Sequence, residues 1–387
     1  MKEVVSIIQA AYLHIPFCAQ ICHYCDFNKV FLKGQPVEEY LRAMESEMKN
    51  TIEAYPTKDL QTIFVGGGTP TALNENQLEM FLTSINQYFI PLTNESLEFT
   101  FEANPGDLSK EKLHILKDAG VNRLSFGVQT FDDDLLKVIG RTHRRSDVFE
   151  TIDLARNVGF SNISMDLMYA LPTQSIDSFK ETLETAFTLE VEHFSAYSLI
   201  IEPKTVFYNL MKKGKLSLPT QDNEAKMYEI VMEYMEKKNY HQYEISNFTK
   251  SGFESRHNLT YWNNDEYYGI GAGAHSYVAG KRVENAGPLK KYMTKIVETG
   301  LPHTNAHTVT INEKMEEEMF LGLRKTAGVS KQKFFNKYGK EIKSVFGKET
   351  EEQINKGLLE ETPETVRLTH EGKLLGNEVF QAFIGII

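Results

Sequence analysis

Short apolar runs alternate with amphipathic stretches over residues 10–200 of this chain. Between the runs, helical periodicity covers 37–54, 109–120 and 146–159, and several of these stretches begin at Asn, Ser or Asp and end at Gly, as helix caps do. Strands that alternate with helices predict a parallel sheet covered by helices, and therefore an α/β fold. The six predicted strands are 11–15, 62–67, 97–103, 123–128, 162–168 and 193–199.

An open doubly wound sheet and a barrel, complete or partial, both satisfy this pattern. Chemically distinctive residues fall at the carboxyl ends of several different strands: Cys18, the turn 66–70, Glu102, Gln129 and Asp166. Active sites of β/α barrels are built in this way, from the ends of many strands around one mouth. The distribution therefore favours a barrel-like arrangement.

Beyond residue 200 the regular alternation of apolar runs and helical stretches ends. A helix is expected near 221–238, followed by a Gly- and aromatic-rich stretch at 257–277 and a helix at 311–325. The tail has the order helix, helix, hairpin, helix, which is winged-helix-like. We expect three parts: a barrel over 1–240, a connecting region over 241–305, and a C-terminal α+β, winged-helix-like domain over 306–387.

Composition and charge describe an ordinary globular protein. Of 387 residues, 41% are hydrophobic and 25% charged, and the net charge is −11. Residues 311–387 carry 12 basic and 13 acidic side chains, so neither the chain nor its tail offers the basic face that nucleic acids require. The start does not resemble a signal peptide, and no window approaches the roughly 18 apolar residues of a membrane span. We expect a cytoplasmic protein that does not bind nucleic acid.

All three cysteines lie in one window, Cys18, Cys22 and Cys25, with the spacing C-x3-C-x2-C. Three thiolates at this spacing can hold three irons of a cubane iron–sulfur cluster and leave the fourth iron open. The alternatives are buried small residues or a fragment of a zinc site, although no second pair of ligands exists for zinc. The odd number of cysteines and the expected cytoplasmic location, where thiols stay reduced, disfavour disulfides.

The segment AYLHIPFCAQICHYCDF (11–27) resembles the radical S-adenosylmethionine (SAM) superfamily, in particular the branch of oxygen-independent coproporphyrinogen oxidases and their heme-chaperone relatives. The resemblance extends over nearly the whole chain. It implies a partial (β/α)6 TIM-type barrel, a [4Fe–4S] cluster on the three cysteines, and SAM bound at the open iron.

The same resemblance assigns SAM contacts residue by residue. Tyr24 would pack near the adenine, and the GGGTP turn (66–70) would receive the methionine amino group. Glycine allows the close backbone approach that this requires. Glu102 suits a ribose hydroxyl, and Arg141 suits a bidentate contact with the ligand carboxylate. The complete set is Tyr12, Tyr24, Gly67, Gly68, Thr69, Glu102, Gln129, Arg141 and Asp166.

Two departures separate the chain from the decarboxylating oxidases of this branch. Phe27 stands where those enzymes have a further cysteine, and only 17 residues precede Cys18. The stretch His257, Asn258, Tyr261, Trp262 instead matches the H-N-x-x-Y-W pattern of the heme chaperones. Histidine is a natural axial ligand of heme iron, and the aromatic rings offer flat faces for a macrocycle.

The alternative interpretation of that stretch is a capped helix start with aromatic core residues. The loop GIGAGAHS (269–276) lacks the context of a dinucleotide fingerprint; we interpret it as a close-packed turn, with His275 as a weaker candidate for a heme ligand.

These features predict a heme-binding chaperone on a radical SAM fold, with heme as cargo and apo-hemoproteins as acceptors. We expect respiratory acceptors, and transient contact with a membrane surface or a homodimer would be compatible with this role. The alternative is a radical SAM enzyme that oxidatively decarboxylates coproporphyrinogen III. A winged-helix regulator that senses heme or oxygen is disfavoured by the charge of the tail.

Overall fold

Six parallel strands form the centre of the fold. A computed structural model describes residues 8–387, and its strands follow one another across the sheet in chain order. Each of the six predicted apolar runs is confirmed as a strand. They are β1 (Ala10–Ile15), β4 (Leu60–Gly67), β5 (Thr93–Ala103), β6 (Arg123–Gln129), β7 (Ile163–Tyr169) and β8 (His193–Ser198).

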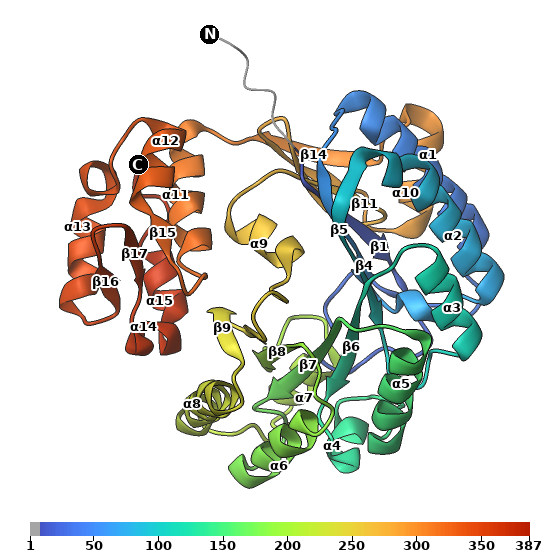
Figure 1. Ribbon diagram of the computed structural model, residues 1–387, viewed down its shortest axis with the longest axis horizontal. Helices are drawn as coiled ribbons and strands as arrows, with labels where there is room; N and C mark the ends of the chain where they lie inside the picture. The colour runs from blue at the N-terminus through green and yellow to red at the C-terminus, as the bar shows by residue number, and fades with distance from the viewer. Residues whose placement is uncertain (1–7) are drawn as a thin grey trace.

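Helices cover the outer, convex face of this curved sheet, as Figure 1 shows. One face of each strand packs on them, with Phe99 and Phe101 of β5 fully buried in the main hydrophobic core. Ser109 caps one helix, and Gly159, in the left-handed conformation, ends another, as the sequence predicts. The covering helices are α1 (Val37–Ala54), α2 (Glu75–Tyr88), α3 (Lys110–Asp118), α5 (Arg145–Val158), α6 (Ile176–Phe187) and α8 (Gln221–Lys237).

The sheet continues beyond both ends of the six strands, to a total of twelve. On one side, β11 (Tyr267–Ile270) runs parallel to β1, and an antiparallel meander follows it. On the other side, the hairpin of β9 (His241–Glu244) and β10 (Asn247–Thr249) pairs with β8. The meander consists of β12 (His275–Val278), β13 (Lys281–Asn285) and β14 (His303–Thr308), and α10 (Leu289–Thr299) lies between its last two strands in the chain.

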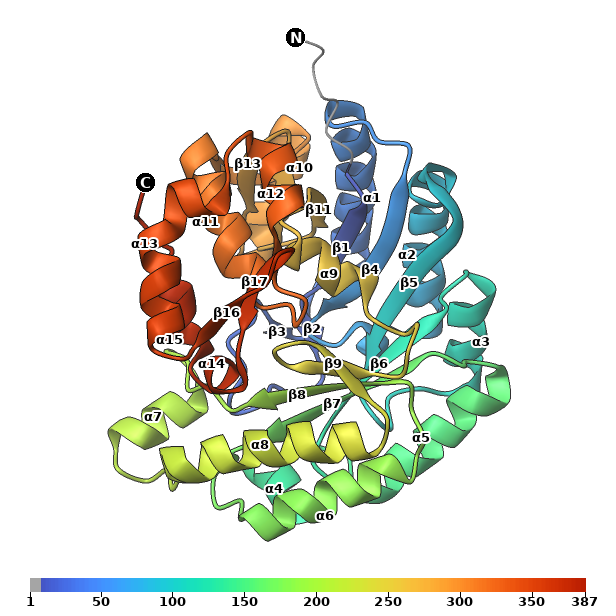
Figure 2. The ribbon, with the colours of Figure 1, turned by 60° about the vertical axis from the view of Figure 1, so that its left-hand side comes forward.

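The short helix α9 (Arg256–Trp262) lies against the concave face of the sheet (Figures 1 and 2). The concave face consists of the inward-facing positions of the six strands. Because side chains alternate along a strand, these positions include Tyr12, Phe64, Glu102, Ser125, Asp166 and Tyr197. The barrel is therefore partial, and α9 lies in its open side.

The C-terminal part has a separate hydrophobic core built around Phe334, Phe346 and Phe383. Its three-stranded sheet has the order β15-β17-β16, and the predicted order of helix, helix, hairpin and helix is confirmed. The last predicted helix is two short ones. The elements are α11 (Ile311–Gly322), β15 (Val329–Ser330), α12 (Lys331–Tyr338), α13 (Ile342–Asn355), β16 (Leu359–Glu361), β17 (Thr365–Leu368), α14 (His370–Leu374) and α15 (Gly376–Gln381).

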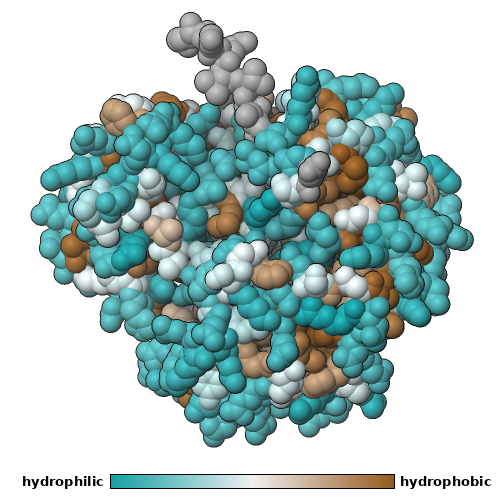
Figure 3. Space-filling view, viewed as in Figure 1, coloured by the Kyte–Doolittle hydropathy of each residue, from teal (hydrophilic) through white to brown (hydrophobic). Residues whose placement is uncertain are grey.

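The predicted division of the chain at residues 240 and 306 stays a prediction. The structure shows that 241–305 shares one sheet with the barrel strands, since β9 to β14 all belong to it. Within residues 8–387, every helix is too short or too polar to cross a membrane. The face seen in Figure 3 is mostly hydrophilic, with hydrophobic residues in small separate groups.

A buried carboxylate makes the stability of this fold depend on pH. Glu47 on α1 is 1% exposed and accepts hydrogen bonds from Gly271 N, Asn285 Nδ2 and the Tyr292 hydroxyl. Burial raises its pKa to about 7 despite these donors. A folded-state pKa above the unfolded value stabilises the protein at low pH, and this contribution disappears as the pH rises from about 4.5 to 7.

We therefore expect the free energy of unfolding to fall by about 3 kcal/mol across this window because of Glu47 alone. Glu47→Gln, which cannot ionise, should lack this fall, whereas Glu53→Gln, at an exposed position of the same helix, should keep it. Urea unfolding at pH 5, 6, 7 and 8 measures the slope. Equal slopes in the wild-type protein and Glu47→Gln would contradict the assignment.

Candidate SAM and iron–sulfur site

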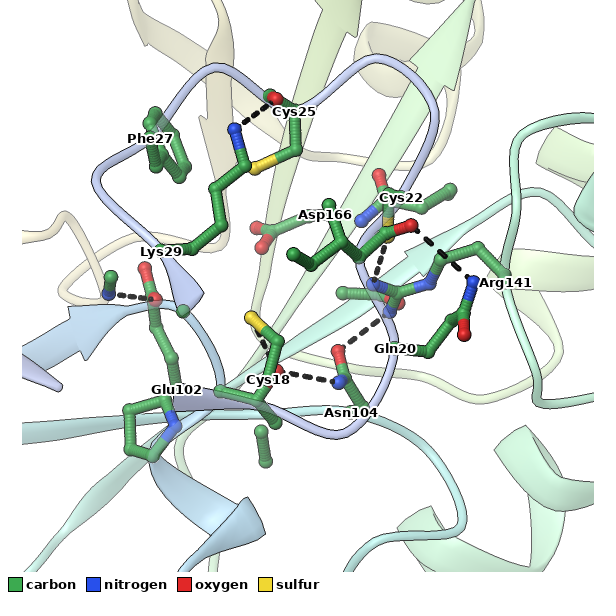
Figure 4. A pocket seen from close by; sticks show the side chains of 18 of the residues that line it. Cys18, Gln20, Cys22, Cys25, Phe27, Lys29, Glu102, Asn104, Arg141 and Asp166 are labelled. Carbon is green, nitrogen blue, oxygen red and sulfur yellow. Dashed lines mark hydrogen bonds between the residues drawn. The ribbon is translucent and has the colours of Figure 1, made fainter. Parts of the chain in front are cut away.

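The cysteine loop lies at the carboxyl end of the barrel. Cys18 ends β2 (Phe17–Cys18), which pairs with β3 (Val30–Phe31) and so closes the loop 19–29. All three thiols line one pocket, which is open to solvent on one side. In Figure 4 the three sulfurs surround this space, with Glu102 on one side and Arg141 and Asn104 on the other.

Asn28 anchors the loop to the glycine-rich turn 269–276. Its side-chain amide donates to Ala272 O at 2.7 Å and to Gly287 O at 2.9 Å, and its backbone carbonyl oxygen lies 2.7 Å from His14 Nε2. A Cβ on Gly273 would lie 2.7 Å from the Asn28 amide nitrogen. The prediction of a close-packed turn is confirmed, and this turn holds the cysteine loop in place.

The turn after β4 brings backbone groups next to the thiols. Gly67 N donates to Glu102 Oε2 at 3.1 Å, and Thr69 Oγ1 lies 3.7 Å from Cys18 Sγ. A Cβ on Gly66 would lie 2.6 Å from Glu102 Oε2, and a Cβ on Gly68 would lie 2.8 Å from the carbonyl carbon of Pro16. At Gly68 the close atoms are mainly backbone, so a side chain there would shift the turn, whereas at Gly66 it would displace the Glu102 carboxylate. The turn thus forms one wall of the pocket.

Arg141 forms the opposite wall. It donates to Asn104 Oδ1 at 2.7 Å, to Gly127 O, and to Cys22 Sγ at 3.6 Å. Asn104 in turn donates to Thr69 Oγ1 at 3.2 Å, so it joins the two walls of the pocket. The sequence analysis missed Asn104, although its position two residues after Glu102, at the end of the same strand, could have indicated it.

Two acids lie at the base of the pocket. Burial raises the pKa of Glu102 to about 8, with a further rise from the negative charge of Asp166. Burial also raises the pKa of Asp166, against hydrogen bonds from Ser195 and Ser125. A cation in this pocket would favour the ionised carboxylates, and SAM carries a positively charged sulfonium.

The structure brings together all but one of the predicted cluster and SAM residues. Tyr24 lines the pocket and packs on the small hydrophobic cluster that includes Phe207 of α7 (Val206–Lys212). Gln129 lines it with φ of 69°, in the left-handed region. Tyr12 does not line it, because its hydroxyl is directed to His14 Nδ1 at 2.9 Å. The lining members are Cys18, Cys22, Tyr24, Cys25, Gly67, Gly68, Thr69, Glu102, Gln129, Arg141 and Asp166.

The predicted heme residues lie apart from this pocket, on α9. Ser255 caps the helix, and Glu98 of β5 accepts from the backbone nitrogens of Arg256 and His257. His257 is 1% exposed; its Nδ1 lies 2.8 Å from Thr62 Oγ1 and its Nε2 lies 2.9 Å from the Tyr261 hydroxyl. This local geometry is a capped helix with its histidine in the core, and heme ligation by His257 stays a prediction.

Trp262, at the end of α9, faces the C-terminal part. The guanidinium of Arg324 lies 4.6 Å from its ring centroid and 5.2 Å from that of Phe380 on α15. The indole Nε1 is buried and has no partner among the side chains that the structure describes. Asn258 is half-buried on the same helix, and His275 is exposed at the start of β12.

The donor set fits a cluster better than a single metal ion. Within residues 8–387, no three His, Cys, Asp or Glu side chains converge on one ion position. In a cubane each thiolate binds a different iron, so thiols spread around a pocket are the expected arrangement. Burial raises the pKa of Cys18 to about 11, so cluster binding must displace its proton.

Comparison with known proteins agrees with this site. The model of the radical SAM superfamily matches residues 12–186, and the model of the HemN C-terminal domain matches 309–375. The solved coproporphyrinogen III oxidase HemN of Escherichia coli, a radical SAM enzyme, superposes with a TM-score of 0.87 over 100% of this chain and 92% of its own, at 21% identity. That likeness establishes the fold. The fold and the cysteine site thus define a radical SAM protein.

Similar proteins of known name identify the family within this superfamily. The heme chaperone HemW of Bacillus subtilis is 58% identical over 98% of this chain and 100% of its own. HemW of Lactococcus lactis is 46% identical, with 97% of each chain covered, and HemW of E. coli is 32% identical over 96% of this chain and 97% of its own. The chain belongs to the HemW family of heme chaperones.

Proposed function

We propose that the protein binds heme and transfers it to apo-hemoproteins, with a [4Fe–4S] cluster on its three cysteines and SAM beside it. The observation that carries this proposal is the full-length similarity to HemW of B. subtilis, which is named a heme chaperone. Phe27 supports it, because the oxidases of the branch have a cysteine at that position. The cluster and SAM follow from membership of the radical SAM superfamily.

We propose that heme binds at α9 through His257, Asn258, Tyr261 and Trp262. When the imidazole proton is on Nδ1, it is donated to Thr62 Oγ1, and the lone pair of Nε2 faces the Tyr261 hydroxyl. Burial, followed by the nearby charge of Arg123, lowers the pKa of His257 to about 3. The ring is therefore neutral at physiological pH, as an iron ligand must be. If Nε2 binds the iron, the hydrogen bond from Nδ1 to Thr62 would orient the ring, as partners of ligating histidines do.

Loss of a residue that hydrogen-bonds to a metal ligand weakens binding by about 10- to 100-fold. His257→Ala removes the ligand itself, so heme binding should weaken by at least this factor. Tyr261→Phe keeps the aromatic ring and frees Nε2, so it should keep the heme affinity. His275→Ala, at the exposed and weaker candidate, is the matched control. Titration with hemin, followed in the Soret region, measures all three. Unchanged affinity in a folded His257→Ala variant would remove this histidine as the ligand and leave the chaperone function standing.

A second experiment separates the chaperone from the enzyme of the same branch. The anaerobically reconstituted protein receives a reductant, SAM and coproporphyrinogen III, and the products are analysed for protoporphyrinogen and 5′-deoxyadenosine. We expect no stoichiometric turnover, together with transfer of heme to an apo-hemoprotein. Substantial turnover with matching amounts of both products would overturn the chaperone function in favour of the oxidase.

The remaining parts of the proposal concern place and partners. We propose that the protein works in the cytoplasm, where an oxygen-labile cluster survives, and that its acceptors are respiratory hemoproteins reached by transient contact with a membrane surface. The acidic balance of the chain, −11 overall, supports partners other than nucleic acids. A homodimer is a further proposal, which sedimentation with and without heme would test.

A further inference from the structure

Lys29 places a positive charge beside the cysteine loop. It lines the same pocket as the three thiols, and its ammonium donates a hydrogen bond to the backbone carbonyl of Cys25. In Figure 4 its side chain reaches towards Cys25. The basic residues of the pocket lining are Lys29 and Arg141. The proposed contacts with SAM involve Arg141 only, so the charge of Lys29 has no role in them.

The backbone on both sides of Lys29 is fixed. The side-chain amide of Asn28, the residue before it, is bonded to the turn 269–276. The backbone nitrogen of Val30, the residue after it, donates to Pro16 O at 2.8 Å. Lys29 is also half-buried. Its charge is therefore held near the cysteines and does not move freely in solvent.

The ammonium of Lys29 lies close enough to act on two of the three thiols. Burial raises the pKa of both Cys18 and Cys25, and Lys29 is among the groups that oppose this rise at each of them. The third thiol has a cation of its own, since Arg141 donates to Cys22 Sγ at 3.6 Å. All three cluster ligands thus lie near a positive charge.

The acids near Lys29 do not cancel this charge. Lys29 donates to a carbonyl oxygen and not to a carboxylate. Asp26, next to Cys25 in the chain, acts on that thiol in the opposite direction but less strongly than Lys29, and it is exposed to solvent. Water and salt screen an exposed charge more than a half-buried one. The field of Lys29 at the thiols is therefore positive.

We propose that Lys29 is a positioning residue that raises the reduction potential of the [4Fe–4S] cluster. This inference rests on the proposed cluster. In the reduction, an external low-potential one-electron donor is oxidised and the cluster gains one electron, with no proton transferred and no bond broken. The added negative charge is attracted by the ammonium, and net charge around the sulfurs is one of the factors that set such potentials.

The consequence concerns SAM. A cluster that is easier to reduce is a weaker donor of that electron to SAM, because the same ammonium stabilises the reduced state. Lys29 therefore works against reductive cleavage of SAM, which suits a protein that carries heme and does not turn SAM over.

Lys29→Gln tests the inference, because it keeps a donor for the Cys25 carbonyl and removes the charge. Redox titration of the reconstituted protein without SAM, followed by the electron paramagnetic resonance of the reduced cluster, measures the potential. At the midpoint potential of the wild-type protein, the ratio of reduced to oxidised cluster should fall about tenfold in the variant. For a one-electron couple this is a shift of about 59 mV to lower potential.

Two variants serve as controls. Lys29→Arg keeps the positive charge and should keep the wild-type potential. Lys33→Gln removes the same charge from an exposed position of the same segment, and it should also keep the wild-type potential, because exposed charges are screened.

The direction of the shift separates a charge effect from a looser loop. Greater access of water stabilises the more highly charged reduced state and raises the potential, whereas loss of a nearby cation lowers it. An unchanged or higher potential in Lys29→Gln at wild-type iron content would overturn the inference. Loss of iron from both Lys29→Gln and Lys29→Met would make Lys29 a residue that holds the loop, and would overturn it too. A wild-type protein that took up no iron would instead overturn the proposed cluster.

Discussion

Cys25→Ala is expected to abolish the cluster. Iron content after anaerobic reconstitution should fall close to zero, and the visible absorbance of a [4Fe–4S] centre should be absent. All three cysteines line the same pocket, and within residues 8–387 the chain has no other thiol. With three thiolates a single iron is left open, whereas two would leave half of the cube without a protein ligand. SAM affinity should fall with the cluster, because the open iron is the expected anchor of the methionine group.

Phe27→Ala is the matched control for this experiment. Phe27 follows Cys25 by two residues, lines the same pocket and is 63% exposed, so its removal changes the loop without removing a ligand. It should reconstitute to the wild-type iron content. If Cys25→Ala also retained four irons per chain, a different ligand set would hold the cluster, and the assignment of the three cysteines would be lost.

Much of the fold was predictable because each barrel strand buries its outer face against helices. In the run 97–103 (LEFTFEA), apolar residues on the outer face alternate with polar residues on the inner face, and this alternation can be read in the sequence. The strands β11 to β14 escaped prediction for the opposite reason. β11 and β12 are only four residues long, too short to show an alternation, and β14 (His303–Thr308) is largely exposed and polar.

The residues of the site could largely be predicted from the sequence, but their contacts with one another could not. Family motifs identified Arg141, but its placement depends on Asn104, which joins it to Thr69. Tyr12 shows what the sequence could not predict. It lies on the expected strand, but its hydroxyl bonds to His14 instead of facing the pocket. The sequence pattern does not reveal a hydrogen bond between two side chains on the same face of a strand.

The α9 segment shows what long-range contacts add. Its sequence, H-N-x-x-Y-W, suggested an aromatic surface, but burial of His257 is decided by Thr62 and Glu98, which lie 195 and 159 residues away in the chain.

Gly68→Ala is expected to damage the SAM site through a single added methyl group. The φ angle of Gly68 is one that any residue adopts, so the effect is purely steric. A Cβ there would lie 2.8 Å from Pro16 C, 2.9 Å from Phe17 O and 3.0 Å from Cys18 Sγ. Two of these atoms are backbone and the third is a cluster ligand, so the turn must shift away from the cysteine loop. Overpacking of this kind costs about 1–3 kcal/mol.

We expect the shift to weaken SAM binding to the reconstituted protein by about 10- to 100-fold, since 1.4 kcal/mol corresponds to a factor of ten. Gly347→Ala on α13 is the matched control: its Cβ would meet only Lys343 Cγ, at an ordinary 3.6 Å, and alanine favours a helix. Equilibrium dialysis with SAM measures both variants at equal iron content. Wild-type affinity in Gly68→Ala would mean that SAM does not approach this turn, and the ligand would then have to be placed on the Arg141 wall alone.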